Sequence, residues 1–143
     1  GWVMVRSESL DAAALVTAME AGDFYASSGV SLRRVERSGN TMSIEVATEP
    51  GVTYTMRFIG TRKGFDATRS PVLSAKGEPL RATQRYSDQI GETLAVVVGT
   101  RAQYTARGDE LYVRAVITSS KKIANPYRKG ETAAAWVQPW QPR

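Results

Sequence analysis

The sequence predicts a mainly β protein: an antiparallel β-sandwich or partly open barrel of six to seven strands that follows one N-terminal α-helix. The first observation behind this fold class is a change of hydrophobic period at Gly29. Apolar residues recur at helical spacing before Gly29 and at alternate positions after it. The second observation is that short turns containing Gly, Pro or Asn separate the alternating segments. The length of 143 residues suits one hydrophobic core that needs no disulfide or metal for stability.

The N-terminal part of the chain carries the pattern of one strand and one helix. Trp2–Val5 is an apolar run that is typical of a short strand. A helical apolar stripe follows, which consists of Leu10, Ala14, Leu15, Ala18 and Met19. Residues 7–9 offer serine oxygens for the N-cap of this helix, and Gly22 is placed to end it.

The rest of the chain is predicted to be β-rich. Seven segments have the pattern or composition of strands: residues 30–37, 42–46, 54–60, 93–99, 102–107, 111–119 and 132–137. The first three predict an antiparallel meander, and residues 107–110 predict a hairpin turn. The Ala-Val-Val-Val sequence within residues 93–99 predicts a strand buried on both faces. Residues 61–90 interrupt the pattern, which is typical of a functional loop or of an excursion with small elements of its own.

The composition limits the chemistry of the chain. It contains no His and no Cys. These absences exclude Ser-His-Asp and Cys-His nucleophiles and zinc sites built from the usual nitrogen and sulfur ligands. We therefore expect no catalytic residue, no cofactor site and no transition-metal site in this chain.

The charge distribution argues against a dedicated nucleic-acid surface. The net charge is +5, from 19 basic and 14 acidic residues, but the basic residues are scattered among acidic ones. We expect solvated strand faces and only weak, non-specific association with nucleic acid. The longest uncharged apolar stretch, at residues 94–99, is far shorter than the about 20 residues that a bilayer span needs, so no membrane partner is expected.

Two groups of side chains are candidates for a ligand surface. Arg33, Arg34 and Arg37 are candidates to bind a phosphate or the carboxylates of a partner. Alternation places Arg33 and Arg37 on one face of their strand and Arg34 on the other, so the three do not form one cluster. Trp136 and Trp140, with Tyr127, would form an aromatic platform for sugars or bases. The alternative for these aromatic residues is that they pin the C-terminal segment onto the sandwich.

Residues 15–29 read Leu-Val-Thr-Ala-Met-Glu-Ala-Gly-Asp-Phe-Tyr-Ala-Ser-Ser-Gly. This phrase resembles the closing segment of the polymerase and histidinol phosphatase (PHP) family of metal-dependent phosphoesterases. In that family, a strand like Trp2–Val5 precedes a helix that ends in Ala-Gly and leads into Phe-Tyr-Ala. Residues 135–139, Ala-Trp-Val-Gln-Pro, are similar to an Ala-Trp-x-x-Pro motif in the β-rich tail of such proteins.

The resemblance implies that residues 1–29 are the last strand and helix of a PHP barrel and that residues 30–143 are an appended β-sandwich-like domain. Divalent metals would be held by His, Asp and Glu of the upstream barrel, and this chain, without His, would carry none of those histidines. The chain also begins without Met inside an apolar run, so we expect an excised piece of a longer protein.

Its partner would then be the upstream catalytic barrel, with Trp2, Phe24 and Tyr25 at the junction. We expect Trp2–Val5 to pair with another copy or to be poorly ordered, and Phe24 and Tyr25 to be buried. The implied function is that of a non-catalytic accessory domain that shapes the metal site or binds substrate elements. The alternative is a free-standing binding module for a glycan, a protein partner or nucleic acid.

Overall fold

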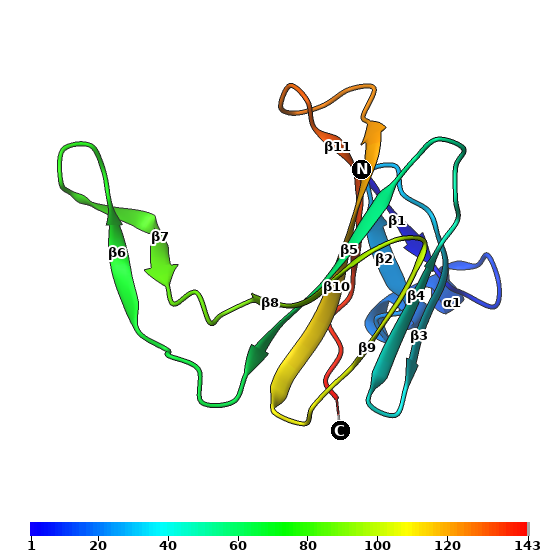
Figure 1. Cartoon of the computed structure of the whole chain (residues 1–143), viewed down its shortest axis with the longest axis horizontal. Helices are drawn as coiled ribbons and strands as arrows, with labels where there is room; N and C mark the ends of the chain where they lie inside the picture. The colour runs from blue at the N-terminus through cyan, green and yellow to red at the C-terminus, as the bar shows by residue number, and fades with distance from the viewer. Residues whose placement is uncertain (143) are drawn as a thin grey trace.

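The protein is a sandwich of antiparallel β-sheets with one short helix and one projecting hairpin (Figure 1). The computed structural model describes residues 1–142, including every side chain of these residues except that of Ala82. The elements are β1 (Trp2–Val5), α1 (Ala12–Glu20), β2 (Phe24–Ser27), β3 (Leu32–Ser38), β4 (Thr41–Val46), β5 (Tyr54–Arg62), β6 (Arg69–Leu73), β7 (Pro79–Tyr86), β8 (Glu92–Val98), β9 (Arg101–Thr105), β10 (Glu110–Lys122) and β11 (Thr132–Val137).

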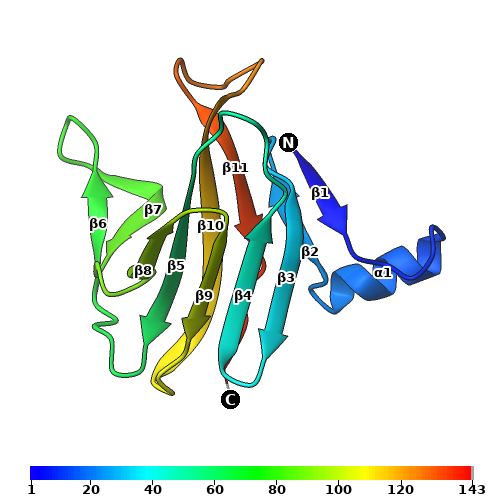
Figure 2. The ribbon, with the colours of Figure 1, turned by 45° about the vertical axis from the view of Figure 1, so that its right-hand side comes forward.

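Two sheets form the body of the molecule. The six-stranded sheet has the order β1-β2-β11-β10-β5-β8, and the three-stranded sheet has the order β3-β4-β9. Figure 2 shows the smaller sheet lying in front of the larger one, with β1 and α1 at one side. The core between them is formed by the inward alternate residues of both sheets, among them Met42, Ile44, Met56, Phe58 and Ile117. Neither sheet closes into a barrel, so the mainly β, antiparallel fold class is confirmed as an open sandwich.

All seven predicted strands after Gly29 are present, with small differences at their ends. Three further strands are present: β2, β6 and β7. The sequence gives little signal for β2, because Phe24–Ser27 is only four residues long and follows the helix after a tight turn at Gly22. Strands β6 and β7 lie inside the predicted excursion, which therefore has elements of its own.

Two predicted connections are wrong in their topology. Strands β3 and β4 form a hairpin, but β5 lies in the six-stranded sheet and β4 pairs instead with β9. Likewise, β9 and β10 are not a hairpin, because they belong to opposite sheets. Both connections cross from one layer to the other, and the inward residues of the strands that they join pack in the common core.

The helix is shorter than predicted and less buried. Asp11, rather than a serine of residues 7–9, is the N-cap, and its carboxylate accepts the N–H of Ala14 at 3.0 Å. Hydrogen bonds from the Ser9 hydroxyl and the Ala14 N–H lower the pKa of Asp11. Leu10 precedes the helix and is 94% exposed, and only Ala18 of the expected apolar stripe is buried. The apolar face of α1 is therefore largely uncovered in this chain.

Strand β8 is also more exposed than predicted. Its Ala-Val-Val-Val centre was expected to be buried on both faces, but Val96 and Val98 are exposed. The physical reason is that β8 is the edge strand of the six-stranded sheet, and only one of its faces meets the core.

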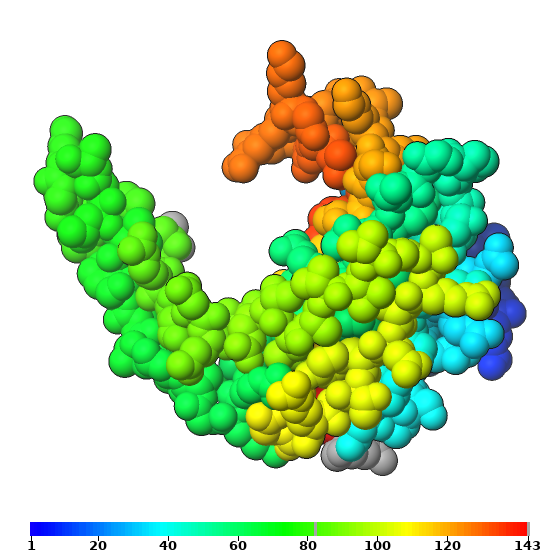
Figure 3. All heavy atoms as spheres, in the orientation of Figure 1, coloured from blue at the N-terminus to red at the C-terminus, as the bar shows by residue number. Residues whose placement is uncertain are grey.

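The hairpin β6–β7 stands away from the sandwich (Figure 1). Its two strands pair with each other and with no other strand that the structure describes. Figure 3 shows a broad hollow between this hairpin and the connection from β10 to β11. Within residues 1–142, no helix has the length and apolar character needed to cross a membrane.

Candidate functional site

A cleft lies at one open side of the sandwich. It has a volume of about 990 Å³. One wall consists of residues 4–6 and 22–25, from the ends of β1 and α1 and from β2, and the other wall is residues 32–38 of β3. Small-molecule sites have volumes of roughly 300–1,000 Å³ and are lined by apolar side chains with a few polar groups. The cleft has such a volume, and its lining combines apolar side chains with six charged ones, which are Arg6, Asp23, Arg33, Arg34, Glu36 and Arg37.

The first wall is fixed by the turn between α1 and β2. Gly22 adopts a positive φ of 75°, which ends the helix and turns the chain toward Asp23. Arg6 then bonds to Asp23 twice: its N–H donates to the Asp23 carbonyl at 2.8 Å, and its Nη2 donates to the carboxylate at 2.8 Å. The end of β1 is thereby tied to the start of β2. The carboxylate of Asp23 therefore forms its ion pair with Arg6 inside this wall.

The second wall carries Arg37 on its inner face. On β3, the residues opposite the buried Val46, Ile44 and Met42 are Leu32, Val35 and Arg37. Residues directly opposite each other share a face of a sheet, so Arg37 continues an apolar row. Its Nη2 donates to the carbonyl of Gln138 at 3.1 Å, and its buried Nε has no hydrogen-bond partner among the described residues. Burial, together with the nearby charge of Arg6, lowers the pKa of Arg37 despite the opposing effect of Asp23.

Arg33 is not on the same face as Arg37, and the prediction of a shared face is wrong. The pairing of β3 with β4 is irregular between Leu32 and Arg34, which places an extra residue in β3 and breaks the alternation. The Nε of Arg33 lies 4.0 Å from the carboxylate of Glu45, and Arg101 also binds this carboxylate, at 3.1 Å. Arg33 therefore belongs to a solvent-facing charge cluster at the rim of the cleft.

The aromatic candidates do not form one platform. Trp140 is half-buried and packs against the core, and its backbone exchanges hydrogen bonds with Val113 at 2.7 and 2.8 Å. Trp136 is exposed on the opposite face of the six-stranded sheet, and Tyr127 is exposed in the connection after β10. Trp140 thus pins the C-terminal segment, which confirms for this residue the alternative to a platform.

The junction candidates lie together at the first wall. Tyr25 is half-buried against the core, and its hydroxyl accepts the N–H of Leu32 at 2.9 Å. Phe24 is half-buried and lines the cleft. Trp2 is 52% exposed in β1. Strand β1 is ordered and paired with β2 over its whole length, and its other edge has no strand partner among the described residues.

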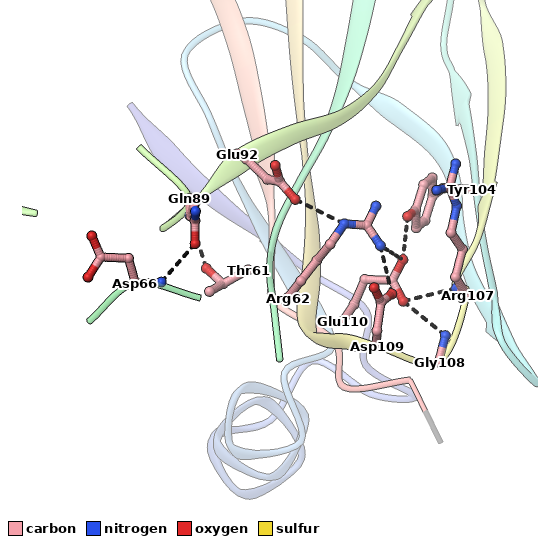
Figure 4. A network of polar contacts seen from close by, with 11 residues as sticks. Thr61, Arg62, Asp66, Gln89, Glu92, Tyr104, Arg107, Gly108, Asp109 and Glu110 are labelled. Carbon is pink, nitrogen blue, oxygen red and sulfur yellow. Dashed lines mark hydrogen bonds and ion pairs between the residues drawn. The ribbon is translucent and has the colours of Figure 1, made fainter. Parts of the chain in front are cut away.

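A second polar cluster lies around the connection that leads from β9 in the small sheet to β10 in the large one (Figure 4). The Glu110 side chain is completely buried, and one of its oxygens accepts the N–H groups of Arg107 at 2.9 Å and Gly108 at 3.1 Å. Its other oxygen accepts the Tyr104 hydroxyl and Arg62 Nη1, the latter at 3.3 Å. Figure 4 shows the Arg62 side chain between Glu92 on one side and Asp109 and Glu110 on the other.

This cluster is satisfied internally. Burial raises the pKa of Tyr104, and the hydrogen bond to Glu110 raises it further. Burial alone would raise the pKa of Glu110, but the hydrogen bonds from Tyr104 and from backbone N–H groups outweigh it, so the pKa is lowered. Every oxygen of Glu110 has donors, so the arrangement stabilises a turn and has no free group for catalysis. Spacing along the sequence gave no sign of it, because Arg62 and Tyr104 come from distant strands.

Among residues 1–142, no group of three or more His, Cys, Asp or Glu side chains is arranged to hold a metal ion. Comparisons with protein-family models, curated proteins and solved structures found no match to this chain. Among the residues that the structure describes, the cleft lined by Arg37 is the best-defined candidate site.

Proposed function

We propose that this chain is a non-catalytic accessory β domain that docks onto the PHP-type catalytic barrel of the same protein through its N-terminal strand and helix. The observation that carries the proposal is the uncovered apolar surface of residues 2–19. The large apolar side chains of this segment that are exposed are Trp2, Val3, Met4, Leu10, Val16 and Met19. Edge strands that face water are normally protected by charges or by a covering element, and β1 carries neither.

A continuous row of side chains on the outer face of the large sheet supports the same proposal. The paired residues that cross all six strands are Val3, Ala26, Trp136, Val116, Arg57 and Val96. Three of them, Val3, Trp136 and Val96, are large, apolar and exposed. Arg57 is the one charged member of the row, and exposed apolar side chains at both edges and at β11 are typical of a surface that another layer covers.

The reading frame upstream of Trp2 provides the first test. The proposal expects it to encode His-x-His and Asp-x-His motifs, which would supply the metal ligands that this chain lacks. A start codon near Trp2 would contradict it. That outcome would favour the alternative, a free-standing binding module, for which the cleft beside β3 is the supporting observation.

A charge placed on β1 tests the docking directly. In the chain alone, Val3→Asp is expected to change the free energy of unfolding by less than about 0.5 kcal/mol, because Val3 is 47% exposed. In the longer protein, the same change should cost about 2–3 kcal/mol, because it would bury an unpaired carboxylate. Thermal and urea unfolding of both proteins measure the difference.

The matched control is Leu73→Asp in the projecting hairpin, away from the large sheet, where Leu73 is 55% exposed. It is expected to have little effect in either protein. If Val3→Asp has the same small effect in the longer protein as in the chain alone, β1 is not a docking strand.

The free edge of β1 also predicts self-association of the isolated chain. An antiparallel pairing of two β1 strands would join two six-stranded sheets and cover part of Trp2 and Val3. Deleting residues 1–6 is expected to leave the sandwich folded and to shift the chain from dimer to monomer in analytical ultracentrifugation. A large loss of thermal stability without a change of association state would show instead that β1 is an integral strand of one self-sufficient domain.

A further inference from the structure

The cleft beside β3 is lined by more basic than acidic side chains, and one of its arginines has no ion pair with a carboxylate of the described residues. Its lining contains Arg6, Arg33, Arg34 and Arg37 and only two acidic residues, Asp23 and Glu36. Three of the arginines have acidic partners: Arg6 pairs with Asp23 at 2.8 Å, Arg34 with Glu36 at 3.5 Å, and Arg33 approaches Glu45 at 4.0 Å. The unpaired charge is that of Arg37.

Water does not reach the Nε atom of the Arg37 guanidinium, because this atom is buried. The guanidinium of Arg37 remains charged at every physiological pH, and its Nε is buried without a hydrogen-bond partner in the part of the chain that the structure describes. A buried, unpaired donor on a charged group costs more free energy than one on a neutral group. An anion that accepts from the guanidinium N–H groups that the Gln138 carbonyl leaves free would make charge-assisted hydrogen bonds.

The surroundings of Arg37 select the rest of the ligand. The other inner-face residues of β3 in the cleft are Leu32 and Val35, and the facing wall contributes Met4, Val5 and Phe24. These side chains contact an apolar or aromatic group favourably, and they lower the local dielectric, which strengthens an ionic hydrogen bond nearby.

We propose that this cleft binds a small organic anion, in which a carboxylate or phosphate group is held by Arg37 and an attached apolar or aromatic group lies against Val35 and Phe24. All residues of the site belong to this chain, so binding is tested on the chain alone. Arg37 acts here as a binding residue. The site contains no group that would transform the ligand.

The test is a titration of the full chain with two probes, phenyl phosphate and 4-phenylbutyrate, which distinguish the two anionic groups. Nitrogen-15 NMR follows the Nε–H signal of Arg37. We expect a saturable shift for at least one probe with a Kd of about 1 mM or lower at low salt. The neutral analogue 4-phenylbutanol is expected to bind about tenfold more weakly or not at all.

Arg37→Gln is expected to weaken binding of the anionic probe at least about tenfold while the chain stays folded. Arg34→Gln is the matched control, because Arg34 lines the same cleft but pairs with Glu36. The affinity of this variant for the anionic probe should stay within about twofold of that of the unaltered chain. Equal affinities of Arg37→Gln and the unaltered chain would overturn the proposal. So would the absence of saturable binding, or equal affinity for the neutral analogue. The last comparison needs no variant and decides the matter even if Arg37→Gln does not fold.

Discussion

Replacing Phe58 with alanine is expected to lower the free energy of unfolding by about 4 kcal/mol, the largest effect of any single change proposed for this chain. Phe58 is completely buried in β5, and its ring stacks on that of Tyr104 in β9 with the centroids 5.5 Å apart. The pair therefore joins the two sheets across the core. Removing the ring loses the transfer free energy of the side chain and leaves a cavity that neither sheet can close.

Urea unfolding followed by fluorescence or circular dichroism measures this loss. Phe58→Leu, which keeps most of the volume, should cost about 1.5 kcal/mol. Val98→Ala, on the exposed edge strand, should cost less than about 0.5 kcal/mol. If Phe58→Ala costs no more than Phe58→Leu, the two sheets do not pack as the structure has them.

Replacing Glu110 with alanine is expected to cost about 3 kcal/mol. The change leaves the N–H groups of Arg107 and Gly108 and the Tyr104 hydroxyl without their shared acceptor. It also removes one carboxylate from Arg62, which retains Glu92 at 3.0 Å and Asp109 at 2.6 Å. The matched control is Glu49→Ala, which breaks an exposed ion pair with Lys121 at 2.7 Å and should cost less than about 1 kcal/mol.

The pH dependence of stability should carry the signature of Glu110. Its pKa is lowered in the folded chain, so the unfolded chain binds a proton more readily. The carboxylate therefore stabilises the fold fully above its ordinary pKa of 4.5, and this contribution is lost as the pH falls through the lower, folded value. Unfolding measured down this acidic range should be less steep with pH in Glu110→Ala. An unchanged pH profile would show that folding does not lower the pKa of Glu110.

The hydrophobic pattern predicted most of the strands but not how the sheets divide them. Alternation shows which side chains of β4 and β5 face the core, and those residues are buried. It contains no information on whether a turn joins neighbours in one sheet or crosses to the other, because both arrangements bury the same face. The crossings after β4 and β9 are decided by contacts between segments far apart in the sequence, such as Met42 with Tyr104 and Thr55 with Val98.

The candidate site was predictable only in part for the same reason. Arg37 could be placed on one face of a strand, but its burial depends on an irregularity beside Arg33 and on β2 lying across the cleft. The tight turn at Gly22 brings Asp23 to Arg6. The sequence predicted that the helix ends at Gly22, but it did not predict the contact between Arg6 and Asp23. Glu110 looked like a solvent-exposed turn residue because the acceptor role of its carboxylate depends on the crossing itself.

The projecting hairpin has a consequence for how this protein can change over evolution. Strands β5 and β8 are antiparallel neighbours, so the chain leaves the large sheet at Arg62 and returns to it at Glu92, and these two side chains are 3.0 Å apart. A second tie, from the N–H of Asp66 to the Gln89 side chain at 2.7 Å, closes the base of the excursion. Everything beyond that base is an insertion into a simple two-strand connection. Closing a longer loop between fixed ends costs only a little more conformational entropy than closing a short one. The hairpin can therefore lengthen, shorten or change its surface under selection by a partner while the core beneath it stays the same.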